Sequence, residues 1–313
     1  MVVRLGNAKG GGDPVYGVQL QTRSVAGQVP EANPDIAWAM KDGLRVATVT
    51  PYTLGYGPFA ADTRIALRRA PSIRGAGLLE QIPQSEILKR VSGDANRDGI
   101  GGRAPWLVVN GKRALGRFGW KATQPDLASQ TGIAFSRDIG LSTRRDSAPW
   151  GDCTAAEHAC RAGPHGSERG GPEVADALLD LVVQYVANLP PPAAPAANEK
   201  LFAATGCGAC HTTLHLANGT PVAAYTDLLL HDLGRGLNDG IAEGAAPPGF
   251  WRTAPLWDVG GSLKIGGLLH DGRARNVGEA VEWHAGEAAA ARARFRALTP
   301  ADKAALVAFV SGL

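Results

Sequence analysis

Methionine, long apolar runs and an excess of one charge are all scarce in this chain of 313 residues. The only methionines are Met1 and Met40. No apolar stretch approaches the ~20 residues that a bilayer-spanning helix needs, so we expect no membrane span. The 32 basic residues nearly balance 29 acidic residues, and a net charge of +3 argues against a nucleic-acid partner.

The opening residues, MVVRLGNAKGGGDP, lack the apolar core and cleavage site of a signal peptide. Glycine and proline, by contrast, are plentiful at 41 and 21 residues, which indicates much loop and turn. Two β-prone runs, 36–40 and 44–50, flank Asp42-Gly43 and predict a hairpin. Helix caps are expected at Asn198, Asn276 and Thr299.

A proline-rich segment divides the chain. A helix is expected over 172–189, and residues 190–197, rich in Pro and Ala, are typical of an extended linker. The length leaves room for about two domains. We therefore predict an N-terminal domain over 1–189 and a second domain over 198–313.

Cys207-Gly-Ala-Cys210-His211 has the spacing of a c-type haem attachment motif. The two thiols can each form a thioether with a haem vinyl group, and the adjacent imidazole can bind the iron from the proximal side. A redox dithiol would need a βαβ context, and a zinc site would need a second pair of ligands. The helical pattern after the motif favours one haem c in a cytochrome-c-like helical domain. The fold class expected is mainly α, with a small β and irregular N-terminal part.

A six-coordinate haem needs a second axial ligand. Neither methionine lies in the predicted haem domain, so a histidine is expected. His284 is the first candidate, because it shares one stripe of a predicted 276–297 helix with Val277, Ala280, Val281 and Ala288. A buried core histidine is the alternative. His270, in the loop before this helix, is the next candidate, or it could bond a neighbouring carbonyl.

Other polar and aromatic residues are candidates for the surroundings of a haem. His231 could contact a propionate or support a ligand. Arg252, Arg273 and Arg275 are candidate propionate partners because a guanidinium matches a carboxylate, although solvated arginines are the alternative. The tryptophans are candidate electron relays or, alternatively, packing residues: Trp120, Trp251, Trp257 and Trp283.

Several ordered blocks carry a family resemblance. They are YGVQLQ (16–21), GAGLLEQIP (75–83), DANRDGIGGR (94–103), LGRFGWKA (115–122), GCGACH (206–211), YTDLLLHDLG (225–234), WRTAPLW (251–257), LHDGRARNVGEAVEWHAGEA (269–288) and the C-terminal ALVAFVSGL. In these blocks the chain resembles the bacterial di-haem oxidoreductases. These are relatives of the di-haem cytochrome c peroxidases and of the methylamine-dehydrogenase maturation enzyme. The resemblance implies that His284 occupies the distal-ligand position, which would give a bis-histidine haem.

The chain departs from the family pattern at its beginning. Family members carry another CxxCH upstream, and none precedes Cys153 here. The expectation is therefore a chain that lacks the N-terminal haem segment, and peroxidase activity would depend on that second haem. Covalent haem attachment in bacteria takes place outside the cytoplasm, so a periplasmic location is expected, with an incomplete N-terminus.

Two further motifs carry metal or redox hypotheses. Asp94, Asn96, Asp98 and Ile100 match the first half of an EF-hand calcium loop, but position twelve is Pro105 rather than Glu. The alternative is an acidic turn without Ca²⁺. Cys153 and Cys160 are expected to form a disulfide in an oxidising compartment. Zinc bound by these cysteines with His158 and His165 is the alternative.

Two functions follow from these patterns. The first is an electron-transfer module with one covalent haem, whose partner is a redox protein or a second haem domain of a peroxidase-like oxidoreductase. The second is a mono-haem peroxidase or ligand-binding haem protein with an open distal face. The identity of the sixth ligand separates them.

Overall fold

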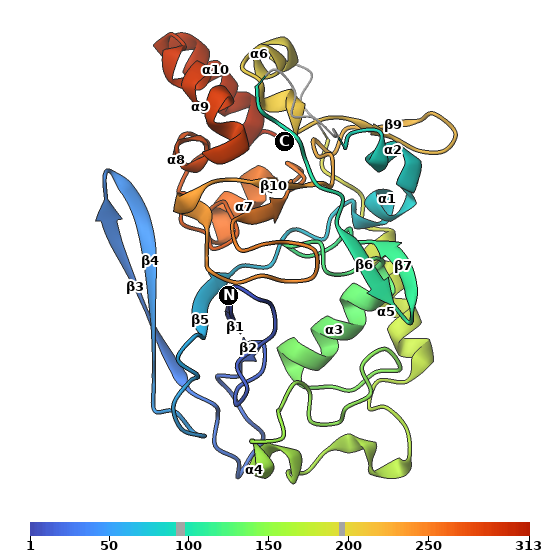
Figure 1. The fold of residues 1–313 in the computed structure, drawn as a ribbon. Coiled ribbons are helices and arrows are strands. Elements are labelled where there is room, and N and C mark those ends of the chain that lie inside the picture. Colours follow the sequence, from blue (N-terminus) through green and yellow to red (C-terminus); the bar gives the residue numbers. More distant parts are fainter. Residues whose placement is uncertain (92–97, 194–197) are drawn as a thin grey trace.

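Strands dominate the first third of the chain in the computed structural model, which describes residues 1–91, 98–193 and 198–313 (Figure 1). β1 pairs antiparallel with β2 and β5, and the remaining strands form two-stranded sheets. The strands are β1 (Val2–Gly6), β2 (Gln19–Leu20), β3 (Asn33–Lys41), β4 (Leu44–Tyr52), β5 (Arg64–Arg68), β6 (Trp106–Val109), β7 (Lys112–Leu115), β8 (Leu214–His215), β9 (Pro221–Val222), β10 (Leu230–Asp232) and β11 (Phe250–Arg252).

Most helices of the structure are short. The α-helices are α1 (Ala76–Gln81), α2 (Gln84–Leu88), α3 (Leu127–Ile139), α4 (His158–Arg161), α5 (Asp176–Ala187), α6 (Glu199–Ala204), α7 (Val259–Ile265), α8 (Val277–Trp283), α9 (Ala289–Ala297) and α10 (Pro300–Ser311). Single 3-10 turns are η1 (Gly166–Arg169), η2 (Cys207–Ala209), η3 (Arg235–Leu237) and η4 (Gly286–Ala288). Within the described residues, no helix is long and apolar enough to cross a bilayer.

The expectation of a mainly α protein with a cytochrome-c-like helical domain is wrong. Of the described residues, 31% are helical and 19% are strand, and they contain no clear cytochrome-c-like helical domain. After the CxxCH motif the chain forms the hairpins β8–β9 and β10–β11, separated by loops, before α7 begins. Glycine and proline recur in this segment, for example at Gly219 and Pro247-Pro248. Both residue types disfavour helix, so the segment forms short strands and loops instead.

The predicted hairpin is confirmed. β3 and β4 pair from Asn33↔Tyr52 to Lys41↔Leu44, which leaves Asp42 and Gly43 as the turn. Both turn residues have positive φ (52° and 77°), as a tight hairpin turn that matches the strand twist requires. Figure 1 shows this long ribbon standing beside the rest of the molecule.

Two of the predicted helix caps are confirmed. The Asn276 side chain accepts from Glu279 N at 2.8 Å, and Thr299 Oγ1 accepts from Asp302 N at 3.1 Å. Asn198 precedes α6 as expected, but it adopts a left-handed backbone and makes no cap with its side chain. The predicted helix over 172–189 is the shorter α5, and the predicted 276–297 helix is divided into α8, η4 and α9.

One hydrophobic cluster joins residues from both sides of the predicted 190–197 linker. Ile87 and Leu127 pack in the same cluster as Leu214, Leu228 and Trp257. A second cluster, formed by α6, α8, α9 and α10 with their neighbours, lies next to the CxxCH motif. The domain boundary stays a prediction, and residues 194–197 of the linker lie outside the described residues.

Candidate functional site

The CxxCH segment folds as a tight turn at one wall of a cavity. Gly206, with φ of 93°, reverses the chain between α6 and η2. His211 N donates to Cys207 O at 2.9 Å, so both cysteines and the histidine belong to one turn. Cys207 and Cys210 are free thiols, and burial raises the pKa of both, that of Cys207 to about 11. Both sulfurs are therefore neutral at neutral pH.

His211 is oriented by the backbone of a second segment. Its Nδ1 lies 2.9 Å from Tyr225 O, and because a carbonyl only accepts, Nδ1 carries the proton while Nε2 keeps its lone pair. Tyr225 has φ of 50° and packs edge-on against Phe202 and Phe309, which fixes the position of this carbonyl. Burial lowers the pKa of His211 to about 4, so its ring is neutral at neutral pH.

His284 has the same arrangement at the end of α8. It is the residue after the helix, and its Nδ1 lies 2.6 Å from Ala280 O. The ring thus donates one turn back along α8 and also keeps Nε2 as a lone-pair nitrogen. Burial lowers the pKa of His284, and the nearby His284 ring in turn contributes to the low pKa of His211. The two neutral imidazoles are within electrostatic range of each other.

The cavity that these histidines line has a volume of about 640 Å³. Its walls are mainly apolar and come from helices, β11 and the loops between them. All five residues of the stripe predicted for the 276–297 segment line it: Val277, Ala280, Val281, His284 and Ala288. These five residues line one cavity although the helix ends at Trp283, and the bond from the His284 side chain to Ala280 O holds that ring against the last turn of α8.

Two buried arginines form a basic part of the wall. Arg252 donates from Nε to Gly119 O at 2.9 Å and from Nη1 to Thr253 O at 3.1 Å, and Arg69 donates to Gly267 O. Burial lowers the pKa of both, that of Arg252 to about 10. No carboxylate among the described residues lies within 4.0 Å of either guanidinium. This wall carries two guanidinium groups whose interacting carboxylates, Asp227 for Arg252 and Asp258 for Arg69, lie beyond 4.0 Å.

His231 lies beside Cys210 in a different electrostatic setting. Its Nε2 is 2.8 Å from Asp227 Oδ2, its Nδ1 is 2.8 Å from Glu287 Oε2, and Cys210 Sγ is 3.8 Å from Nδ1. Burial opposes a charge on this ring, but these hydrogen bonds outweigh it and raise the pKa of His231 to about 12. His231 is therefore an imidazolium held between two carboxylates.

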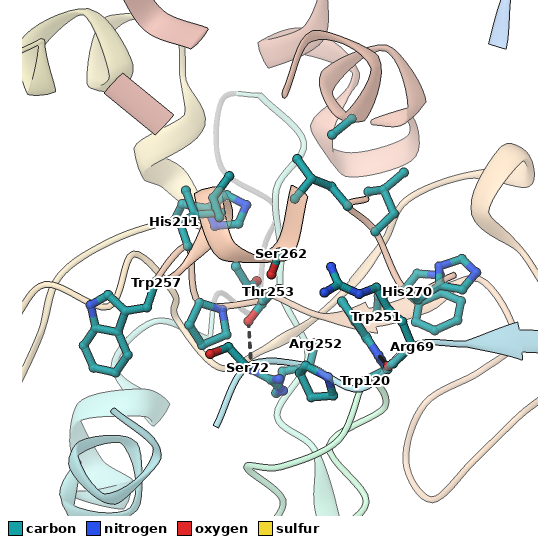
Figure 2. Close-up of a pocket in the computed structure, with 18 of the residues that line it drawn as sticks. Arg69, Ser72, Trp120, His211, Trp251, Arg252, Thr253, Trp257, Ser262 and His270 are labelled. Atoms are coloured by element: carbon teal, nitrogen blue, oxygen red, sulfur yellow. Dashed lines mark hydrogen bonds between the residues drawn. The ribbon is translucent and has the colours of Figure 1, made fainter. Parts of the chain in front are cut away.

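His270 and Trp251 stack at the other side of the cavity. Their ring centroids are 3.8 Å apart with an interplanar angle of 7°, and Lys121 Nζ lies 4.0 Å from the Trp251 ring. Figure 2 shows this pair on one side and His211 with Trp257 on the other. Burial and the cations Arg68, Arg273 and Lys121 hold the pKa of His270 well below its usual range.

Comparison with known protein families identifies the chain. A family model described as "Di-haem oxidoreductase, putative peroxidase" matches residues 54–313. The chain belongs to this di-haem oxidoreductase family. No curated protein and no solved structure matches it. The resemblance drawn from the sequence blocks is thereby confirmed, and the family implies a peroxidase-like oxidoreductase with a haem cofactor.

Some candidate residues of this di-haem oxidoreductase lie away from the cavity lining. Arg273 pairs with Asp271 at 2.8 Å, and Arg275 pairs with Glu279. Their roles toward a haem stay predictions without support from these contacts.

The calcium loop predicted at 94–100 is only partly described. Asp94 and Asn96 lie outside the described residues. Asp98 Oδ1 accepts from Arg294 Nη2 at 2.5 Å, and Ile100 lines the cavity. Calcium at this loop stays a prediction.

Cys153 and Cys160 form the expected disulfide. Zinc bound through these cysteines with His158 and His165 is excluded, since neither sulfur is a free thiolate.

Sequence reasoning missed several residues that organise the di-haem oxidoreductase site. The sequence predicted no role for Arg69, and Asp227 and Glu287 lie inside the blocks of family resemblance without a predicted role. Glu287 accepts from His231 and from the backbone N–H groups of Gly101, Gly102 and Asp232. No local pattern marks Glu287, since its partners Gly101, Gly102 and His231 are distant in the chain.

Proposed function

We propose that this di-haem oxidoreductase carries one haem c in the cavity, attached through Cys207 and Cys210, with its iron between His211 and His284. The observation that supports this proposal most directly is that two imidazoles have the same hydrogen-bond arrangement. Each Nδ1 is tied to a backbone carbonyl and each ring is neutral and lines the same cavity, as Nε2 ligation of iron needs. Two free thiols on the same turn as His211 are available for thioether bonds to the haem.

The charges of the cavity also fit the group. Haem propionates are carboxylates, and Arg252 and Arg69 are buried guanidinium groups that no described carboxylate neutralises at close range. Apolar side chains of the second hydrophobic cluster, such as Phe202, Phe295 and Leu306, line the cavity and exclude water from it.

We further propose that the domain serves as an electron-transfer module outside the cytoplasm. The haem supplies reversible one-electron oxidation and reduction of its iron. His211 and His284 would hold that iron, since a hydrogen bond to a main-chain carbonyl orients each ring. The chain contains one CxxCH motif, so the partner would be a redox protein or a second haem domain, and peroxide reduction would depend on that second haem.

Replacing the distal candidate tests this function. His284→Ala should convert a low-spin haem into a high-spin one, because it removes a strong axial ligand while Cys207, Cys210 and His211 remain. Visible spectra of the oxidised and reduced protein report the change, and a pyridine haemochrome assay should give one haem per chain. His215→Ala, a surface histidine, is the matched control and should keep the wild-type spectrum.

Two results would contradict the proposal. A wild-type spectrum that is already high-spin and shifts with peroxide or cyanide would favour a mono-haem peroxidase or ligand-binding protein with an open distal face. Extraction of the haem by acid acetone would contradict covalent attachment through the two cysteines.

A further inference from the structure

The β3–β4 hairpin is a two-stranded sheet, and β3 forms its outer edge. β4 lies against β5, and Figure 1 shows β3 on the outer side of the ribbon. In a hairpin with a two-residue turn, the residues that flank the turn, here Lys41 and Leu44, exchange both hydrogen bonds, and the bonding direction alternates along the strand. The N–H and C=O groups of Ile36, Trp38 and Met40 therefore point away from β4.

These outward backbone groups bond to no backbone group of the described residues. An unpaired strand edge is a template for another strand, and an isolated two-stranded sheet is only marginally stable in water. Proline or a bulge protects many exposed edges, but β3 pairs with β4 in an unbroken register and has no proline after Pro34. From Asp35 to Lys41 the edge is therefore open to the addition of a strand.

One face of the hairpin is anchored to the rest of the chain. Ile36 and Trp38 pack against a hydrophobic cluster built on β1, β2 and β5. The Arg45 guanidinium carbon lies 4.1 Å from the centroid of the Trp38 ring. Arg45 also donates from Nε to Arg273 O at 3.0 Å and from Nη2 to Gly272 O at 2.6 Å. These contacts hold the edge in a fixed position and leave the opposite face of β3 uncovered.

The uncovered face of β3 carries a self-complementary set of side chains. These are Asp35, Ala37, Ala39 and Lys41, which alternate along the strand and are all exposed. Neither charge has an ion-pair partner among the described residues. When two copies of β3 run antiparallel about a two-fold axis at Trp38, Asp35 of each copy lies opposite Lys41 of the other. Opposite charges at directly facing positions stabilise a strand pair, and the alanines between them face each other without a clash.

The same two-fold axis fits the backbone. Because the Trp38 N–H and C=O point outward, two copies of Trp38 can exchange both hydrogen bonds across the axis. Ile36 of each copy can exchange them with Met40 of the other. A register displaced by two residues would place Asp35 and Lys41 opposite neutral residues, so the charges select this register.

We propose that β3 pairs with β3 of a second copy of this chain, which gives a symmetric dimer with a four-stranded sheet. Contacts that use the same patch on both subunits about a two-fold axis are the commonest in homo-oligomers. A strand of a different protein would not require the mirrored order of charges that this edge carries. The contact does not involve the haem cavity, so it is independent of the proposed function.

Sedimentation velocity of the holo-protein over a range of concentrations tests the contact. The wild type should pass from monomer to dimer as the concentration rises. Asp35→Lys should raise the dimer dissociation constant roughly tenfold or more, because two attractive pairs become repulsive. Asp35→Lys/Lys41→Asp should restore the dimer. Asp62→Lys, at an exposed turn residue outside β3, is the matched control and should leave the dimer unchanged.

Cysteine cross-linking tests the register. Ala37 of one copy would face Ala39 of the other with Cα atoms about 4.5 Å apart, a separation that a disulfide can span. A mixture of the Ala37→Cys and Ala39→Cys proteins should therefore form cross-linked dimers under mild oxidation, and either protein alone should form few. A wild type that stays monomeric would overturn the proposal and leave a strand of another protein as the occupant. A dimer insensitive to Asp35→Lys, or a mixture that cross-links no better than either protein alone, would also overturn it.

Discussion

The partners of each ring nitrogen separate His231 from the two proposed ligands. His211 and His284 each donate to one carbonyl and stay neutral, whereas His231 donates to the carboxylates of Asp227 and Glu287 and is charged. One residue type therefore has two roles in the same cavity. The difference lies in tertiary contacts, not in the local sequence.

Removing the Glu287 carboxylate should show how strongly the charged state of His231 depends on its carboxylate partners. Glu287→Gln leaves a buried cation with one partner and should lower the free energy of unfolding near neutral pH by about 3–5 kcal/mol. Denaturant titration measures the change. Glu282→Gln is the control, because Glu282 pairs with an exposed arginine, Arg296, and should cost about 1 kcal/mol or less.

The same variant should flatten the pH profile of stability. Hydrogen bonds outweigh burial and lower the pKa of Glu287 to about 2 from 4.5, so its contribution is present above 4.5 and is lost as the pH falls through 2. The pKa of His231 rises to about 12 from 6.5, so its contribution is full below 6.5 and is lost as the pH rises toward 12. Wild-type limbs that match those of Glu287→Gln would contradict the pairing.

At this scale the sequence was informative where chemistry depends on spacing. Cys207, Cys210 and His211 are within one turn, so their proposed shared role could be read from spacing, and the stripe predicted the inward direction of His284. Arg69 and Glu287 could not be predicted in the same way, because their partners come from distant segments. For the same reason the sequence does not distinguish Arg273 from Arg252, whereas the structure pairs Arg273 with Asp271 and places Arg252 in the cavity wall.

Among the elements, the break between α8 and α9 matters most for the site. His284 ends α8, Gly286 has φ of 54°, and Glu287 follows in η4. The break lets His284 line the cavity while Glu287, three residues later, reaches His231. An uninterrupted helix over 284–287 would not direct the side chains of His284 and Glu287 to these two places.

Gly286→Ala should therefore disturb the site through the backbone. A Cβ at Gly286 would lie 2.3 Å from Asp232 O, in addition to the cost of a left-handed alanine. We expect a loss of about 2–3 kcal/mol in unfolding free energy and partial high-spin character in the haem spectrum.

Gly219→Ala is the control for this substitution. Gly219 has φ of 83°, and a Cβ there meets nothing within 4 Å, so it should cost about 1 kcal/mol with an unchanged spectrum. Equal losses for the two variants would show that contact with Asp232 O is unimportant.

Elements with local causes were predictable, and those with distant causes were not. The β3–β4 hairpin depends on Asp42-Gly43, and the caps at Asn276 and Thr299 depend on residues three positions away. The fold class was wrong because β8–β11 are strands of two or three residues that pair across loops. Such short strands have too few residues to show an alternating pattern.

Across the whole molecule, the shared core links the two predicted domains. Ile87, before the 190–197 segment, is completely buried in the cluster that contains Leu214 and Leu228, beyond that segment. The two parts therefore stabilise each other, whatever their boundary. Regular spacing of apolar residues does not by itself mark a buried face, because Leu178, Leu181 and Tyr185 on α5 are exposed.

Ile87→Ala should lower the stability of both parts together. We expect a loss of about 2–5 kcal/mol, with the Soret and far-ultraviolet dichroism transitions shifting by the same amount. Val108→Ala, at a residue 78% exposed, should shift neither. A Soret transition that stays at its wild-type midpoint in Ile87→Ala would show that the haem-binding part unfolds on its own.

The separation of His211 and His284 along the chain has a mechanical consequence. Iron bound by both would close a loop of roughly 70 residues and act as a cross-link that the unfolded chain lacks. Loop closure of that length corresponds to roughly 4 kcal/mol of chain entropy. Haem insertion and the ordering of β8–β11 would then be one event. In the haem-free chain, proteases should cut first between His211 and His284.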